Sequence, residues 1–85
     1  MTTVRVTADH LARGERLAAG RCPLALAVAE ALPGSQPVVS GQWVWTWRGG
    51  RRVRHDLPED VAERVRGYDR AGQMEPFEFA LAEGA

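Results

Sequence analysis

Apolar residues between positions 22 and 32 lie nearly all round a helix, and Glu30 is the only charge in the segment. Pro23 suits the first turn of a helix, and Pro33 disfavours helical geometry in the residue before it, which predicts an end at Leu32. A helix that is apolar on most sides is usually buried, and this one is shorter than the roughly 20 apolar residues that a bilayer requires. We therefore expect it to be the central helix of a small domain.

Five other segments are typical of strands, because they alternate apolar and polar residues or are rich in aromatic and β-branched residues. These predicted strands are 3–6, 38–40, 42–48, 51–56 and 76–81. Helical spacing predicts two more helices. One follows Thr7 as an N-cap and ends near Gly14, and the other begins at Pro58 and ends before Gly72.

The predicted order of elements is β-α-α-β-β-β-α-β. Short strands mixed with few helices, in a chain too short for repeated βαβ crossovers, favour an α+β fold. We expect a single small domain over residues 1–85, with a mostly antiparallel sheet of about four strands and the helices packed on one face. Residues 82–85 are expected to form a flexible tail.

Charge and composition exclude several classes of protein. The formal net charge is zero, so a general polyanion binder is not expected and any binding of nucleic acid must depend on a local patch. The single cysteine allows no intramolecular disulfide and no cysteine-based metal site. The N-terminus lacks the apolar core of a signal peptide, so we expect a cytoplasmic protein without a membrane segment.

Three tryptophans share one face of the strand 42–48, because side chains alternate along a strand: Trp43, Trp45 and Trp47. A two-residue loop, Gly49-Gly50, is one way to close the hairpin with the next strand. It places Arg52 across from Trp47 and Arg54 across from Trp45. Tryptophan and arginine would then share an exposed face, available to a partner or to stacked bases.

A three-residue loop that includes Arg51 shifts the pairing by one residue, which exchanges the two faces completely. Trp47 then faces Val53, and Arg52 and Arg54 move to the outer face. Each tryptophan carries a large apolar area that so small a domain can hardly leave in water. We therefore favour this second register, with the tryptophans packed on the central helix, and keep the first as the alternative.

The hairpin 43–54 is the candidate binding site. Four arginines fall within seven residues that contain no acid: Arg48, Arg51, Arg52 and Arg54. Such a patch can contact phosphates, and Trp45 and Trp47 could stack single-stranded bases. The alternative is a solvated strand face or a sheet edge protected by charge, because four acids follow closely between positions 56 and 63.

No arrangement of residues predicts catalysis, a metal or a cofactor. Cys22 begins a helix, where a thiol can be activated, but neither His10 nor His55 is near it in sequence and the chain contains no Asn to orient a histidine. These three residues also lack the spacing of a metal site. We therefore expect a non-enzymatic protein with no cofactor and no small-molecule substrate.

Three motifs carry a resemblance: Val-Thr-Ala-Asp-His at positions 6–10, Cys-Pro-Leu-Ala-Leu-Ala at 22–27 and Glu-Pro-Phe-Glu-Phe at 75–79. In this order they resemble small uncharacterised proteins of bacteriophages and related bacterial mobile elements. The motifs are packing motifs, so the resemblance implies a shared fold and an accessory protein acting on a host factor, and no activity.

The leading hypothesis is a module that binds a protein partner or a second copy of itself. Val44 and the segment 38–39 are candidates for a dimer interface, since a sheet covered by helices on one side leaves its other face bare. The alternative is a nucleic-acid-binding module that uses the tryptophan- and arginine-rich hairpin 43–54.

Overall fold

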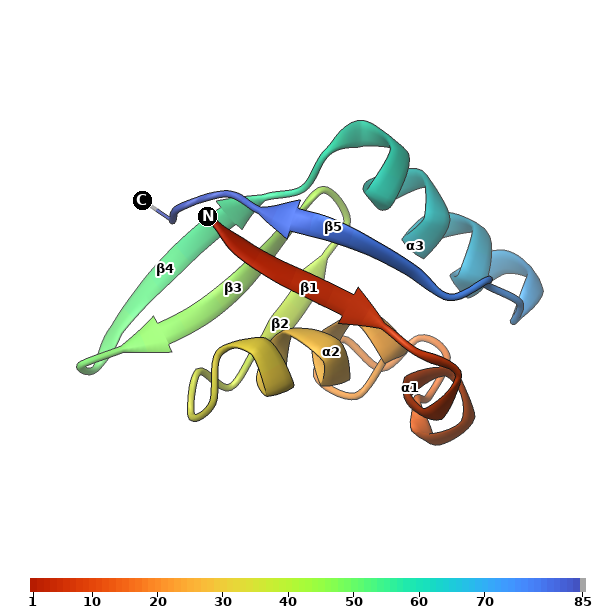
Figure 1. The fold of residues 1–85 in the computed structure, drawn as a ribbon, viewed down its shortest axis with the longest axis horizontal. Coiled ribbons are helices and arrows are strands. Elements are labelled where there is room, and N and C mark those ends of the chain that lie inside the picture. Colours follow the sequence, from red (N-terminus) through yellow and green to blue (C-terminus); the bar gives the residue numbers. More distant parts are fainter. Residues whose placement is uncertain (85) are drawn as a thin grey trace.

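Helix α2, Pro23–Ala31, lies below strand β1, Thr2–Val6, in the computed structural model, which describes residues 1–84 (Figure 1). Cys22 is the N-cap and Pro23 occupies the first turn, as the sequence predicts, while Leu32 is the C-cap. Most of the helix is buried, including Leu24 and Val28. The prediction of a buried helix over these residues is therefore confirmed.

The predicted order of elements is also confirmed. The other helices are α1, Ala8–Arg13, and α3, Glu59–Ala71. The strands are β1, Thr2–Val6; β2, Val38–Ser40; β3, Trp43–Arg48; β4, Arg51–Asp56; and β5, Phe77–Leu81. The fold is a small α+β domain with antiparallel strand pairs. No helix within residues 1–84 has the length and apolar character that crossing a membrane demands.

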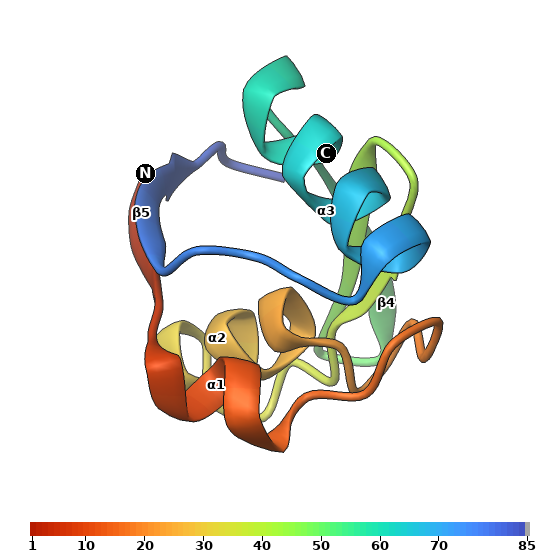
Figure 2. The same ribbon diagram turned by 90° about the vertical axis from the view of Figure 1, so that its right-hand side faces the viewer.

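The strands form two small sheets, and the expected single sheet of about four strands is wrong. β1 and β5 pair with each other, with Val4 opposite Phe79, and β2, β3 and β4 form a separate sheet in that order. Figure 2 shows the two sheets on different sides of α2. The physical reason lies in α2 itself, because a helix that is apolar on most sides can be covered by more than one sheet.

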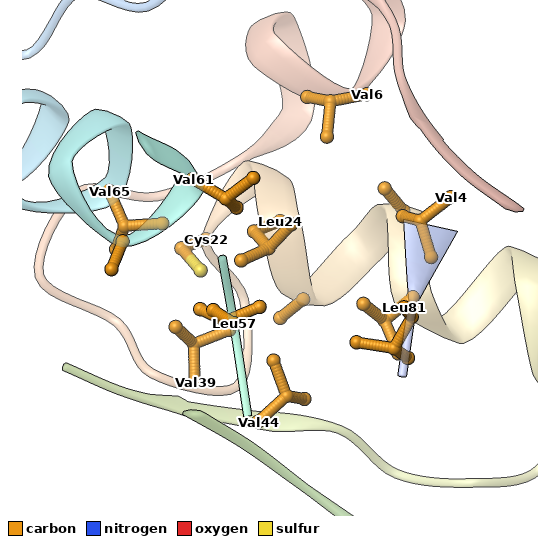
Figure 3. Close-up of a cluster of buried hydrophobic side chains, with 14 residues drawn as sticks. Val4, Val6, Cys22, Leu24, Val39, Val44, Leu57, Val61, Val65 and Leu81 are labelled. Carbon is orange, nitrogen blue, oxygen red and sulfur yellow. The ribbon is translucent and has the colours of Figure 1, made fainter. Parts of the chain in front are cut away.

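One core joins both sheets to α2 and α3 (Figure 3). Val4 comes from β1, Leu81 from β5 and Val44 from β3, while Val61 comes from α3. Leu24 of α2 is fully buried among them. The aliphatic side chains fill this core, and the core cluster includes none of the three tryptophans.

Hydrogen bonds hold the start of α1 and the end of α3. Thr7 and His10 form a capping box at the start of α1, and the buried His10 ring donates from Nε2 to Glu30 on α2 at 2.6 Å. At the other end of the chain, Gly72 has a left-handed φ of 73° and ends α3 by donating its N–H to the Tyr68 carbonyl. The ends of α1 and α3 are therefore held by hydrogen bonds as well as by packing.

Candidate binding surface

The turn of the β3–β4 hairpin determines which side chains share a face. Gly49 and Gly50 have positive φ angles of 57° and 78°, as both central residues of a type I′ turn require. This two-residue loop pairs Trp45 with Arg54 and Trp47 with Arg52. The favoured register with a three-residue loop is therefore wrong, and the alternative that puts tryptophan beside arginine is correct.

The inner face of the hairpin carries small or hydrogen-bonded side chains instead of tryptophan. Val44 is fully buried, and Thr46 and His55 are almost completely buried beside it. The His55 ring donates from Nδ1 to the Ala82 carbonyl at 2.9 Å, and the Thr46 hydroxyl lies 2.8 Å from Nε2, within hydrogen-bond distance. The Thr46 and His55 side chains, the buried polar groups on this face, thus both have hydrogen-bond partners.

The end of the chain covers this inner face. Ala82 accepts the hydrogen bond from His55, and Gly84 lies so close to the Val53 side chain that a Cβ on Gly84 would collide with it. Residues 82–84 of the expected tail thus lie against the hairpin, and residue 85 falls outside the described part of the chain. The tail therefore covers the inner face around Val53 and His55, while Arg48 and Arg51 on the same face stay exposed beside the turn.

The outer face of the three-stranded sheet will be called the Trp–Arg face. It consists of Val38, Ser40, Trp43, Trp45, Trp47, Arg52, Arg54 and Asp56. The Arg52 guanidinium lies 4.0 Å from the centre of the Trp45 ring, and the Arg54 guanidinium lies 5.3 Å from that of Trp43. The Trp43 and Trp45 rings meet edge to face, with centroids 6.1 Å apart. Each of these two guanidiniums therefore covers one side of a tryptophan ring, on the face that points away from the core.

Exposure on this face increases toward the hairpin turn, which projects beyond the rest of the molecule (Figure 1). Trp43 and Trp45 are half-buried, whereas Trp47 is 43% exposed and Val38, on the neighbouring strand, is 37% exposed. These two belong to the small set of large apolar side chains left in water. The Trp–Arg face therefore combines exposed apolar area with fixed positive charge.

The predicted site residues divide between the two faces of the hairpin. Trp45, Trp47, Arg52 and Arg54 come together on the Trp–Arg face. Arg48 and Arg51 pair with each other beside the turn, and alternation puts them on the opposite face. The predicted site residues did not include four members of the face: Val38, Ser40, Trp43 and Asp56. Alternation along the strand could have found Trp43, whereas Val38 is revealed only by its pairing with Trp45.

The charges on the Trp–Arg face are only partly balanced. Arg54 forms an ion pair with Asp56 at 3.3 Å, on the same strand. No carboxylate within residues 1–84 lies within ion-pair distance of Arg52. Arg52 therefore remains available to an acidic group of a partner.

The residues considered for catalysis have other surroundings. Cys22 is buried at the start of α2, and burial raises the pKa of its thiol, which is the opposite of what a nucleophilic thiolate requires. Both histidines use both ring nitrogens in hydrogen bonds within the fold. In the part of the chain that is described, no three metal-ligating side chains gather.

Comparison with known proteins gives no family: no protein-family model, curated protein or solved structure matches this chain. The resemblance to phage proteins stays a prediction, and the case for a function rests on the geometry of the chain.

Proposed function

We propose that this protein is a non-enzymatic binding module that recognises a protein partner through the Trp–Arg face. The observation that carries the proposal is the shared exposed face of Trp47, Trp45 and Arg52 on a sheet. Tryptophan and arginine are the residue types most enriched among the energetically dominant contacts of protein interfaces. In line with the resemblance to phage proteins, the partner is proposed to be a host protein.

Binding of single-stranded nucleic acid is the second candidate, because the register puts arginine and tryptophan together. Three observations favour a protein over it. Guanidiniums already cover the rings of Trp43 and Trp45, so among the described residues only the Trp47 ring of this face stays open to a stacked base. Arg54 is paired with Asp56, and the remaining arginines of the hairpin are divided between its two faces. The net charge of the chain is zero.

Photocrosslinking from the Trp–Arg face tests the proposal and identifies the class of partner. The photoreactive residue benzoylphenylalanine replaces Trp47 in one variant and Ala12, exposed on α1, in the control, and each is irradiated in bacterial cells. We expect an adduct from position 47 that resists nuclease and contains a second polypeptide. An adduct of two copies of this chain would support the proposal in its self-associating form.

Two results would overturn this function. Adducts at position 47 that nuclease destroys would favour the second candidate and exclude the first. Equal protein adducts at positions 47 and 12 would mean that the Trp–Arg face has no special role in binding.

A further inference from the structure

The backbone of β4 has an unpaired edge, which gives the Trp–Arg face a second means of binding. Leu57 donates its N–H to the Gln42 carbonyl at 2.9 Å, so the pairs that exchange hydrogen bonds include 42 with 57 and, by alternation, Val44 with His55. The backbone groups of the residues between them therefore point away from β3. Within residues 1–84, no strand pairs with β4 on that side.

The side chains of these edge residues lie on the Trp–Arg face. Arg52, Arg54 and Asp56 each pair with a tryptophan of β3, so their backbone N–H and C=O groups are the ones that point outward. The N–H of Trp47 agrees with this pattern, since it donates to the Ser35 carbonyl on the opposite side of β3. A strand laid on the edge of β4 would therefore put every second side chain next to these three residues.

Charge selects the kind of strand that fits. On the Trp–Arg face, this edge carries Arg52, Arg54 and Asp56. Arg54 is paired with Asp56, and Arg52 has no carboxylate partner within residues 1–84. An acidic side chain is favourable beside Arg52 and Arg54, and unfavourable beside Asp56 at the end of the edge. A second copy of β4 is a poorer match, because it would bring two arginines and one acid to the same face.

We infer that β4 binds an extended acidic segment of the partner as an added strand, with alternate carboxylates next to Arg52 and Arg54. Main-chain hydrogen bonds along the edge supply affinity in this mode of recognition, and the alternating side chains supply specificity. The inference rests on the proposed function, since it specifies the chemistry of the protein partner at the Trp–Arg face.

Hydrogen exchange followed by NMR tests this inference with a defined probe, the peptide acetyl-Thr-Glu-Thr-Glu-Thr-Gln-Thr-amide. At saturating peptide we expect exchange of the Arg52 and Arg54 amides to slow by about tenfold or more, because these amides gain hydrogen bonds. The amide of His55, which already bonds to β3, should change less. One control peptide has Lys in place of Glu. Another is N-methylated at alternate residues, which keeps the charge of the peptide but removes backbone N–H groups that would donate to β4.

Substitution in the protein completes the test. Arg52→Glu should weaken binding of the acidic peptide by about tenfold, since an opposite charge next to the ligand is replaced by a like charge. Arg70→Glu, at an exposed position on α3, makes the same change in net charge and should have a much smaller effect. Equal binding of the Lys peptide or of the N-methylated peptide would overturn the inference.

Two further outcomes separate this inference from the proposed function. If position 47 crosslinks to a protein but the acidic peptide leaves the Arg52 and Arg54 amides unprotected, the strand-addition mode is wrong and the proposed function stands. If the same amides are already protected in the free protein at concentrations where its mass doubles, a second copy occupies the edge and the inference is wrong.

Discussion

The contact between Arg52 and Trp45 explains how a small domain accommodates tryptophans outside its core. The guanidinium lies 4.0 Å from the ring centre, so a charged group that stays hydrated at its rim covers one side of an aromatic ring. Arg54 covers Trp43 in the same way at 5.3 Å. Each arginine therefore has a structural role in addition to the binding role proposed for it.

Arg52→Ala should lower the free energy of unfolding by about 0.5–1 kcal/mol, the usual range for a partly exposed cation–π contact. It should also shift the tryptophan emission to longer wavelength, because Trp45 becomes more exposed. Urea denaturation followed by fluorescence measures both effects. Arg51→Ala is the matched control, since Arg51 lies on the same strand but points to the other face. An equal loss of stability in both variants would contradict the stacking role of Arg52.

The β3–β4 hairpin shows why its register was difficult to predict from the sequence. The Gly49-Gly50 pair indicates a two-residue turn, whereas the apolar area of three tryptophans indicates burial, and the two signals require opposite registers. The turn prevails because guanidiniums can cover indole rings at the surface. The expectation that tryptophan is buried is therefore a weak guide to strand register where a neighbouring arginine can cover the ring.

Substitutions at Gly49 test how strongly the turn sets this register. A side chain at Gly49 would meet no atom within 4 Å, so the positive φ of 57° is the only constraint there. Gly49→Asn should be nearly neutral, because Asn-Gly suits a type I′ turn. Gly49→Val should lower the free energy of unfolding by about 1–2 kcal/mol, because a β-branched residue is strained in the left-handed region. Thermal denaturation compares the two variants, and equal stability would mean that the turn does not constrain the hairpin.

At the scale of the whole molecule, the sequence predicts the elements better than their pairing. Apolar spacing is local, and it locates the central helix and all five strands closely. The pairing of β1 with β5 joins residues more than seventy positions apart, such as Arg5 and Glu78, which no local pattern reveals. The same limit applies to the binding surface. Alternation along β3 shows that the tryptophans share a face, but only the pairing of strands puts Arg52 opposite Trp47 and Val38 opposite Trp45.

The two sheets should unfold together, because both bury side chains against the same helix. Leu24 of α2 is fully buried in the core that joins them (Figure 3), so Leu24→Ala leaves a cavity and should cost about 2–5 kcal/mol. That is a large fraction of the roughly 5–15 kcal/mol that stabilises a typical domain. Leu17→Ala is the matched control, since Leu17 is 74% exposed and its loss should change stability by less than about 0.5 kcal/mol.

Two probes report on the sheets separately in the Leu24→Ala experiment. Tryptophan fluorescence follows the three-stranded sheet, which holds all three tryptophans, and amide exchange at Val4 and Phe79 follows the two-stranded sheet. Both probes should report the same loss in the free energy of unfolding. A cavity beside α2 weakens the one core that the two sheets share among the described residues. A larger loss at one probe would mean that the two sheets open independently and that α2 does not couple them.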